Sequence, residues 1–273
     1  DSPANYGLDY EEVEFQASDG VTLRGWLIAG GTDRVIVQTH FGVQCNRAGW
    51  SAKGRGPVKP WKRDINFLRQ AEYLSRRGYS VLMYDIRGHG SSDIGTTPWV
   101  SWGPEEARDV VAAVDYISNR DDFRSAPIGL LSICMGSAAT TYAYGLHELS
   151  TRENVRALVA VQPLLYRYFV EALGMPGFIE RAAAAVSRER LGFELSAPNF
   201  IDHASKVSVP TLVLQNQNDP WTNLDMVRAY TDALSTEKEL RLVDLEKNRF
   251  AAYEHLGHAP ESFVDWFDKH VSA

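Results

Sequence analysis

The sequence is poor in cysteine, with only Cys45 and Cys134 among its 273 residues. The two lie far apart and match no zinc-binding or redox spacing. They do not make a disulfide framework, so we expect a protein of a reducing compartment, the cytoplasm. The first residues are polar and lack the apolar region of a secretory signal.

Long hydrophobic runs and an excess of positive charge are also missing. No apolar stretch reaches the roughly 18 residues that a membrane-spanning helix needs, so we expect no membrane partner. The formal net charge is −7 and the isoelectric point is near 5.5. Because nucleic-acid-binding domains are usually basic, we expect no nucleic-acid partner either.

Motifs for cofactors and metals are absent from the sequence. There is no Walker motif, no Gly-x-Gly-x-x-Gly after a predicted strand, and no metal-ligand spacing of His, Cys and carboxylates. We therefore expect neither a cofactor nor a metal. The sequence leaves the oligomeric state open.

Short apolar strands alternate with amphipathic helices along most of the chain. Strands are expected over residues 11–17, 21–29, 34–39, 79–84, 128–133, 155–161, 210–215 and 239–245. Helices are expected over residues 64–77, 104–119, 224–234 and 260–271, with one more beginning at residue 136. This alternation predicts an α/β fold with a mostly parallel sheet of eight strands, covered by helices on both faces.

Two segments interrupt the alternation. Residues 164–206 contain two helical patterns without a strand, and we interpret them as a small helical cap inserted into a core of residues 1–163 and 207–273. Residues 43–60 form a long irregular connection after the strand 34–39. Long connections of this kind are uncommon and often functional, so we expect this one to wall the active site, although it also fits a surface loop.

The strand at residues 128–133 stops abruptly at Cys134, and Gly136 opens a helix of small residues. A strand, a tight turn and a helix with a nucleophile at the apex form a nucleophile elbow. Gly136 fits it because a Cβ there would obstruct the close approach of the helix. The alternative is a buried core cysteine, since free cysteines are often fully buried.

The chain resembles the α/β-hydrolase superfamily over nearly its whole length. The resemblance rests on these features: His40-Phe41-Gly42, Asp85-x-Arg-Gly-His-Gly-x-Ser92, Ser132-Ile-Cys134-Met-Gly136, Asp219, and the last strand and helix. A cysteine in the elbow is similar to the dienelactone-hydrolase branch. The resemblance implies Cys134 as nucleophile, the backbone amides of Phe41 and Met135 as the oxyanion hole, and Asp219 as the acid of a triad. Asp219 also fits a capping residue, because Asp-Pro pairs initiate turns.

The sequence departs from the family pattern at histidine. Arg249 stands where many relatives have the triad histidine, and the nearest histidines are His255 and His258. We expect His255 to be the base, with His258 as the alternative, and a site without histidine remains a third reading. A guanidinium near Cys134 would favour a thiolate, but it cannot carry a proton to a leaving group.

Four further residues are expected around the substrate: His40, Trp50, Tyr166 and Arg249. His40 also fits a structural role, with its ring bonded to backbone. Aromatic side chains gather in the loops and the cap, which indicates a small apolar or aromatic substrate. We expect a hydrolase or acyl-transfer enzyme acting on an ester, thioester or lactone. The alternatives are a lyase, isomerase or cyclase of specialised metabolism on this fold, or a ligand-binding protein without catalysis.

Overall fold

The computed structural model describes residues 1–42, 44–52 and 63–272. An eight-stranded sheet lies at its centre, in the order β1-β2-β6-β3-β7-β8-β9-β10. Its strands are β1 (Tyr10–Gln16), β2 (Thr22–Ile28), β6 (Ser80–Tyr84), β3 (Val35–Thr39), β7 (Ile128–Ile133), β8 (Val155–Val161), β9 (Thr211–Asn216) and β10 (Lys238–Val243). β2 pairs antiparallel with β1 and β6, and the other pairs are parallel. The predicted mostly parallel eight-stranded sheet is confirmed.

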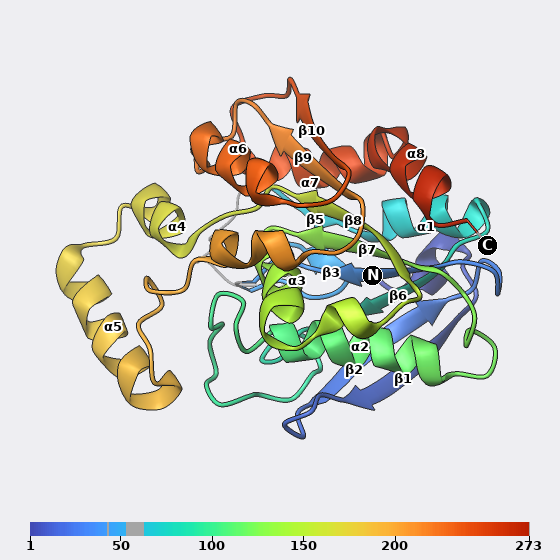
Figure 1. Cartoon of the computed structure of the whole chain (residues 1–273), viewed down its shortest axis with the longest axis horizontal. Coiled ribbons are helices and arrows are strands. Elements are labelled where there is room, and N and C mark those ends of the chain that lie inside the picture. The colour runs from blue at the N-terminus through green and yellow to red at the C-terminus, as the bar shows by residue number, and fades with distance from the viewer. Residues whose placement is uncertain (43, 53–62, 273) are drawn as a thin grey trace.

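Helices cover both faces of this sheet (Figure 1). One face carries α1 (Leu68–Arg76), which packs on β6, and α8 (Glu261–His270), which packs on β8 and β9. The other face carries α2 (Ala107–Asn119), α3 (Met135–Leu146) and α6 (Leu224–Ala233). Every residue of β3, β6 and β7 is buried, as expected for central strands enclosed by helices.

The segment between β8 and β9 leaves the sheet. It contains α4 (Tyr166–Leu173), α5 (Gly177–Leu191) and the 3₁₀ helix Phe200–Lys206. Figure 1 shows α5 standing away from the sheet, beyond α4. Phe178 on α5 is 67% exposed, so this helix contributes little to the core.

The helix α7 (Arg249–His258) is not among the helices expected from the sequence. Asn248 begins it, and its Oδ1 accepts a hydrogen bond from the Phe250 amide at 2.9 Å. Residues 249–253 are all buried, so the helix shows no apolar stripe with a polar opposite face. A helix whose first five residues are all buried, a charged arginine among them, lacks at that end the periodic pattern from which sequence predictions are made.

Smaller elements complete the described residues. The strands β4 (Gly49–Trp50) and β5 (Ile65–Asn66) form a short antiparallel ribbon, and 3₁₀ helices cover Pro3–Tyr6 and Leu149–Thr151. The predicted active-site wall at residues 43–60 lies largely outside the described residues. No helix within the described ranges is both long and apolar enough to cross a bilayer.

Candidate active site

Cys134 stands at the sharp turn between β7 and α3. Its φ of 56° and ψ of −112° are unusual for a residue with a side chain, and such strain persists only where the surroundings enforce it. The Cys134 amide donates to the Val161 carbonyl at 2.7 Å, and the Ser137 amide donates to the Cys134 carbonyl at 2.9 Å. These bonds fix the backbone of the turn on both sides of the thiol.

Gly136 allows α3 to approach the neighbouring strand β3. A Cβ at this position would lie 2.5 Å from the Thr39 carbonyl oxygen and 3.1 Å from that of His40. The first contact is too short for a carbon atom and the second is tight, so a larger residue here would have to displace the backbone at Thr39. The close approach brings Met135, the first residue of α3, beside Phe41, which follows β3.

Cys134 lines a small and largely apolar cavity of about 20 Å³, enough for about one water molecule. The cavity lies at the carboxyl ends of β3 and β7, where parallel sheets place their ligands. Its described walls are Phe41, Gly42, Trp102, Cys134, Met135, Leu164, Phe169, Trp221, Arg249, Phe250 and Tyr253. Phe169 comes from α4, so the segment between β8 and β9 supplies part of the roof.

Arg249 occupies the place beside Asp219 where the family pattern has histidine. Its Nη1 donates to Asp219 Oδ2 and, at 2.8 Å, to Thr222 Oγ1. Its Nη2 donates to the Gln162 carbonyl at 2.7 Å. The Thr222 hydroxyl and the Trp221 amide also donate to the Asp219 carboxylate, at 2.6 and 3.0 Å. Asp219 therefore holds a fixed cation.

The charges at this site reinforce one another. Burial opposes the charge of Arg249, but the negative charges of Tyr253, Asp219 and Cys134, when ionised, raise the pKa of Arg249 above its ordinary value. The guanidinium is therefore permanently charged. Burial is also the main reason why the pKa of Tyr253 lies well above its usual value, and interactions with Cys134 and Asp219 add to that shift while Arg249 opposes it.

Tyr253 is a site residue that the sequence analysis missed. It follows Arg249 by four residues on α7, and residues four apart lie on the same face of a helix. Its ring stacks on Phe41, with centroids 5.0 Å apart and planes at 16°. Tyr253 and Cys134 line the same cavity. The spacing from Arg249 was the available signal, but it becomes visible only once residues 249–258 are known to be helical.

The two candidate histidines lie farther along α7. His258 is exposed, and its Nε2 is 3.0 Å from Arg69 Nη1. His255 is half-buried, and its Nε2 is buried without a hydrogen-bond partner. Burial lowers the pKa of His255, and Glu261 partly offsets this. Among the described residues, neither histidine lines the Cys134 cavity or bonds to Asp219.

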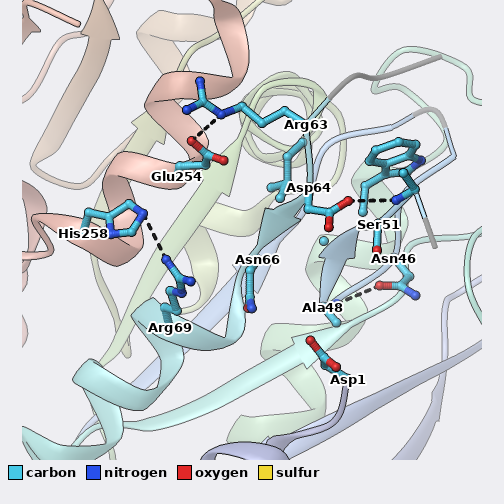
Figure 2. A pocket seen from close by; sticks show the side chains of 14 residues that line it. Asp1, Asn46, Ala48, Ser51, Arg63, Asp64, Asn66, Arg69, Glu254 and His258 are labelled. Carbon is cyan, nitrogen blue, oxygen red and sulfur yellow. Dashed lines mark hydrogen bonds and ion pairs between the residues drawn. The ribbon is translucent and has the colours of Figure 1, made fainter. Parts of the chain in front are cut away.

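Figure 2 shows that His258 instead borders a second, larger and more polar pocket of about 750 Å³. Arg63 pairs there with Glu254 at 2.9 Å, and Arg69 points towards His258. Trp50, predicted to contact the substrate, is buried against this second pocket and not against Cys134.

His40 and Tyr166 lie behind the cavity walls. The Nδ1 of His40 bonds to the Phe41 carbonyl at 2.6 Å, and its Nε2 accepts from the Ile86 amide at 3.2 Å. Burial, helped by the nearby His89, lowers the pKa of His40 to about 4, so the ring is neutral and orders the turn that carries Phe41. Tyr166 packs edge-on against Trp102, with ring centroids 5.5 Å apart. Of the four predicted substrate-contacting residues, Arg249 alone belongs to the described lining of the Cys134 cavity.

Comparison with known proteins gives a consistent picture. A family model described as alpha/beta hydrolase fold matches residues 60–196. The chain is 27% identical over 205 residues to thiohydrolase aneE of Aspergillus aculeatus. The aligned region covers 73% of this chain and 57% of that protein. The chain is 26% identical over 164 residues to polyketide transferase grgF of a Penicillium species, covering 58% and 46%.

A solved structure adds to the sequence matches. The esterase Pf2001 of Pyrococcus furiosus superimposes with a TM-score of 0.72 at 20% identity, over 99% of this chain and 96% of the esterase. At this identity the likeness shows the fold alone. The chain spans about half of the length of the two fungal relatives, 57% and 46%.

Proposed function

Because the chain belongs to the alpha/beta hydrolase fold family, we propose that it is an acyl-transfer enzyme with Cys134 as its nucleophile. The sulfur attacks the carbonyl carbon of a small apolar ester, thioester or lactone, and a covalent acyl-enzyme forms. Water or another nucleophile then accepts the acyl group. The observation that carries the proposal is the strained backbone of Cys134, which holds the thiol at the apex of a turn and against an apolar cavity.

The oxyanion hole is assigned to the backbone amides of Phe41 and Met135. Both residues line the cavity beside Cys134, and Met135 is the first residue of a helix, where amide groups have no partner within the helix. Attack on a carbonyl builds negative charge on its oxygen, and fixed donors stabilise that charge. Loss of one such donor typically lowers the rate about 10²–10³-fold.

Asp219 is assigned the role of orienting Arg249. Neither His255 nor His258 is assigned the role of the base. The buried carboxylate and Thr222 hold the guanidinium in one position next to the thiol. A fixed cation there stabilises negative charge that develops at the site during acyl transfer. In this proposal Asp219 stands where a triad has its acid, and it positions the charged guanidinium of Arg249 in place of an imidazole.

A thioester suits this arrangement best. Its leaving group departs as a thiolate, which needs less help from a proton donor than the alkoxide of an ester. The names of two relatives, a thiohydrolase and a polyketide transferase, agree with acyl chemistry of this kind. The cavity walls, among them Leu164 and Phe169, have the apolar character that suits an apolar acyl group, and they must move apart to admit one because the cavity is only about 20 Å³.

The test is turnover of S-ethyl thiobutanoate and p-nitrophenyl butanoate, with and without iodoacetamide. Cys134→Ala is expected to abolish turnover of both. Cys45→Ser is the control, because serine still donates to the Phe41 carbonyl that Cys45 contacts. Cys45→Ser is expected to stay active and to stay sensitive to iodoacetamide. Turnover that survives Cys134→Ala would remove the proposal.

Arg249 also favours a second candidate function. Because a guanidinium gives up no proton, water is activated poorly, and the same cavity would then serve a lyase, isomerase or cyclase. Tight binding of apolar carbonyl compounds, without release of acid or thiol from any ester, would support this candidate in place of acyl transfer.

A further inference from the structure

We propose that the hydroxyl of Tyr253 is the proton carrier of this site, in the role that histidine has in a triad. The inference rests on the proposed acyl transfer at Cys134. It assigns Tyr253 as a catalytic residue, because Tyr253 and Cys134 line the same small cavity, which holds about one water molecule.

The cavity offers few alternatives for moving a proton. Among its described lining residues, three carry a side chain that ionises: Cys134, Arg249 and Tyr253. Arg249 has five donors and no acceptor, so it cannot take a proton from an attacking group. A phenol, in contrast, both donates and accepts hydrogen bonds. Apart from Cys134, Tyr253 is therefore the residue of the described cavity wall that can receive one proton while it releases another.

Packing holds the Tyr253 ring in one orientation. The side chain is 1% exposed. One face stacks on Phe41, and the rings of Phe67 and Phe250 pack edge-on at 6.5 and 5.8 Å. Arg249 lies one helical turn earlier, with its guanidinium carbon 5.7 Å from the centre of the ring. Such fixed placement within reach of the reacting atoms is what general acid–base catalysis requires.

The proton movements balance over a full cycle. In acylation, the bond between sulfur and the carbonyl carbon forms, and the bond to the leaving group breaks. The proton of the thiol passes to the Tyr253 oxygen while the phenolic proton passes to the leaving group. In deacylation, the acceptor gives its proton to Tyr253, the phenolic proton returns to sulfur, and the acyl group leaves as acid or transfer product. Tyr253 is neutral before and after each step.

The burial of Tyr253 fits such an exchange. Burial keeps the phenol from losing its proton alone, and the nearby ionised forms of Cys134 and Asp219 act in the same direction. A simultaneous exchange avoids a buried phenolate. Arg249 stabilises whatever negative charge develops on the phenol oxygen during the exchange.

The experiment compares Tyr253→Phe with the wild type on p-nitrophenyl butanoate and phenyl butanoate. The two esters carry the same acyl group, but p-nitrophenolate leaves without a proton far more readily than phenolate. Tyr230→Phe is the matched control, because it also removes a buried tyrosine hydroxyl, one that bonds to Thr141 at 3.0 Å and lies outside the cavity lining. Thermal unfolding verifies that both variants are folded.

We expect Tyr253→Phe to lower kcat/KM for phenyl butanoate by about 10² or more, and for p-nitrophenyl butanoate by less than about tenfold. The butanoyl-enzyme should then accumulate, because deacylation also lacks its proton carrier, and Tyr230→Phe should change neither ester. Equal losses on both esters, or no loss, would overturn the role of Tyr253 while leaving Cys134 as the nucleophile. If the wild type forms no butanoyl adduct at Cys134, the proposed function itself fails.

Discussion

Arg249 donates a hydrogen bond from Nη1 to Oδ2 of Asp219, and both side chains are only 1% exposed. In a triad the buried acid steadies an imidazole, which gains and loses a proton. Here it holds a guanidinium, which does neither. The pair therefore contributes position and charge, and proton transfer has to come from another group.

The first prediction concerns the stability of this pair. Arg249→Met removes the cation and leaves the buried Asp219 carboxylate with the uncharged donors Thr222, Trp221 and, at 3.5 Å, Gln215. Breaking a buried ion pair in this way typically lowers the free energy of unfolding by about 3–5 kcal/mol. The double variant Arg249→Met/Asp219→Asn should recover part of the loss, because no uncompensated charge remains. Urea unfolding measures both, and additive losses would contradict a coupled pair.

The second prediction concerns activity. Arg249→His places an imidazole next to Asp219 and close to Cys134, which adds a stronger base to the proton carrier Tyr253. General base catalysis contributes about 10²–10⁴-fold, so even an imperfectly placed ring should raise hydrolysis of phenyl butanoate by about tenfold. Arg249→Gln is the control, since it removes the same charge without adding a base. Equal losses of activity in both variants would contradict this prediction and would show that the site needs the charge of the guanidinium.

The third prediction concerns the turn at Cys134. Gly136→Ala sets a Cβ against the Thr39 and His40 carbonyl oxygens, so α3 or the His40–Phe41 turn must move. Overpacking of this kind typically costs about 1–3 kcal/mol, and we expect activity to fall as well because the Phe41 amide shifts. Gly177→Ala on α5 is the control, because its Cβ would meet nothing closer than Arg181 Nη1 at 3.5 Å. Equal melting temperatures and rates for the two variants would contradict this view of the turn.

The fourth prediction concerns acid stability. In the folded protein the pKa of His40 is lowered to about 4 from 6.5, mainly by burial. The unfolded chain takes up this proton near pH 6.5 and the folded chain does not, so stability is retained above pH 6.5 and lost as the pH falls towards 4. The loss amounts to about 3 kcal/mol for this group. In His40→Asn, whose side chain does not titrate, the free energy of unfolding should fall less between these pH values. Identical pH profiles would show that His40 does not contribute.

The central strands could be predicted because they are buried on both faces and read as continuous apolar runs, as in residues 128–133. The elbow could be predicted because Gly136 follows Cys134 at the spacing that a strand-to-helix turn needs. Helix α7 could not, since residues 249–253 are all buried and show no amphipathic period.

Predictions about single side chains were limited by the unpredicted helix. The sequence indicated Arg249 at the place of histidine. Its side chain has three hydrogen-bond partners: Asp219 and Thr222 precede α6, and Gln162 follows β8, far away in the chain. Trp50 was predicted at the Cys134 cavity because it follows β3 in a long connection. The ribbon of β4 and β5 instead places it against the second pocket. Such contacts depend on loop paths, which local sequence patterns do not determine.

The most direct test of the account is the mass of the intact protein after incubation with S-ethyl thiobutanoate, followed by peptide mapping. The account predicts one added butanoyl group, located on Cys134 and absent from Cys134→Ala, with Cys45 unmodified. A protein that turns over the thioester with no adduct on Cys134, or with the adduct on another residue, would contradict it.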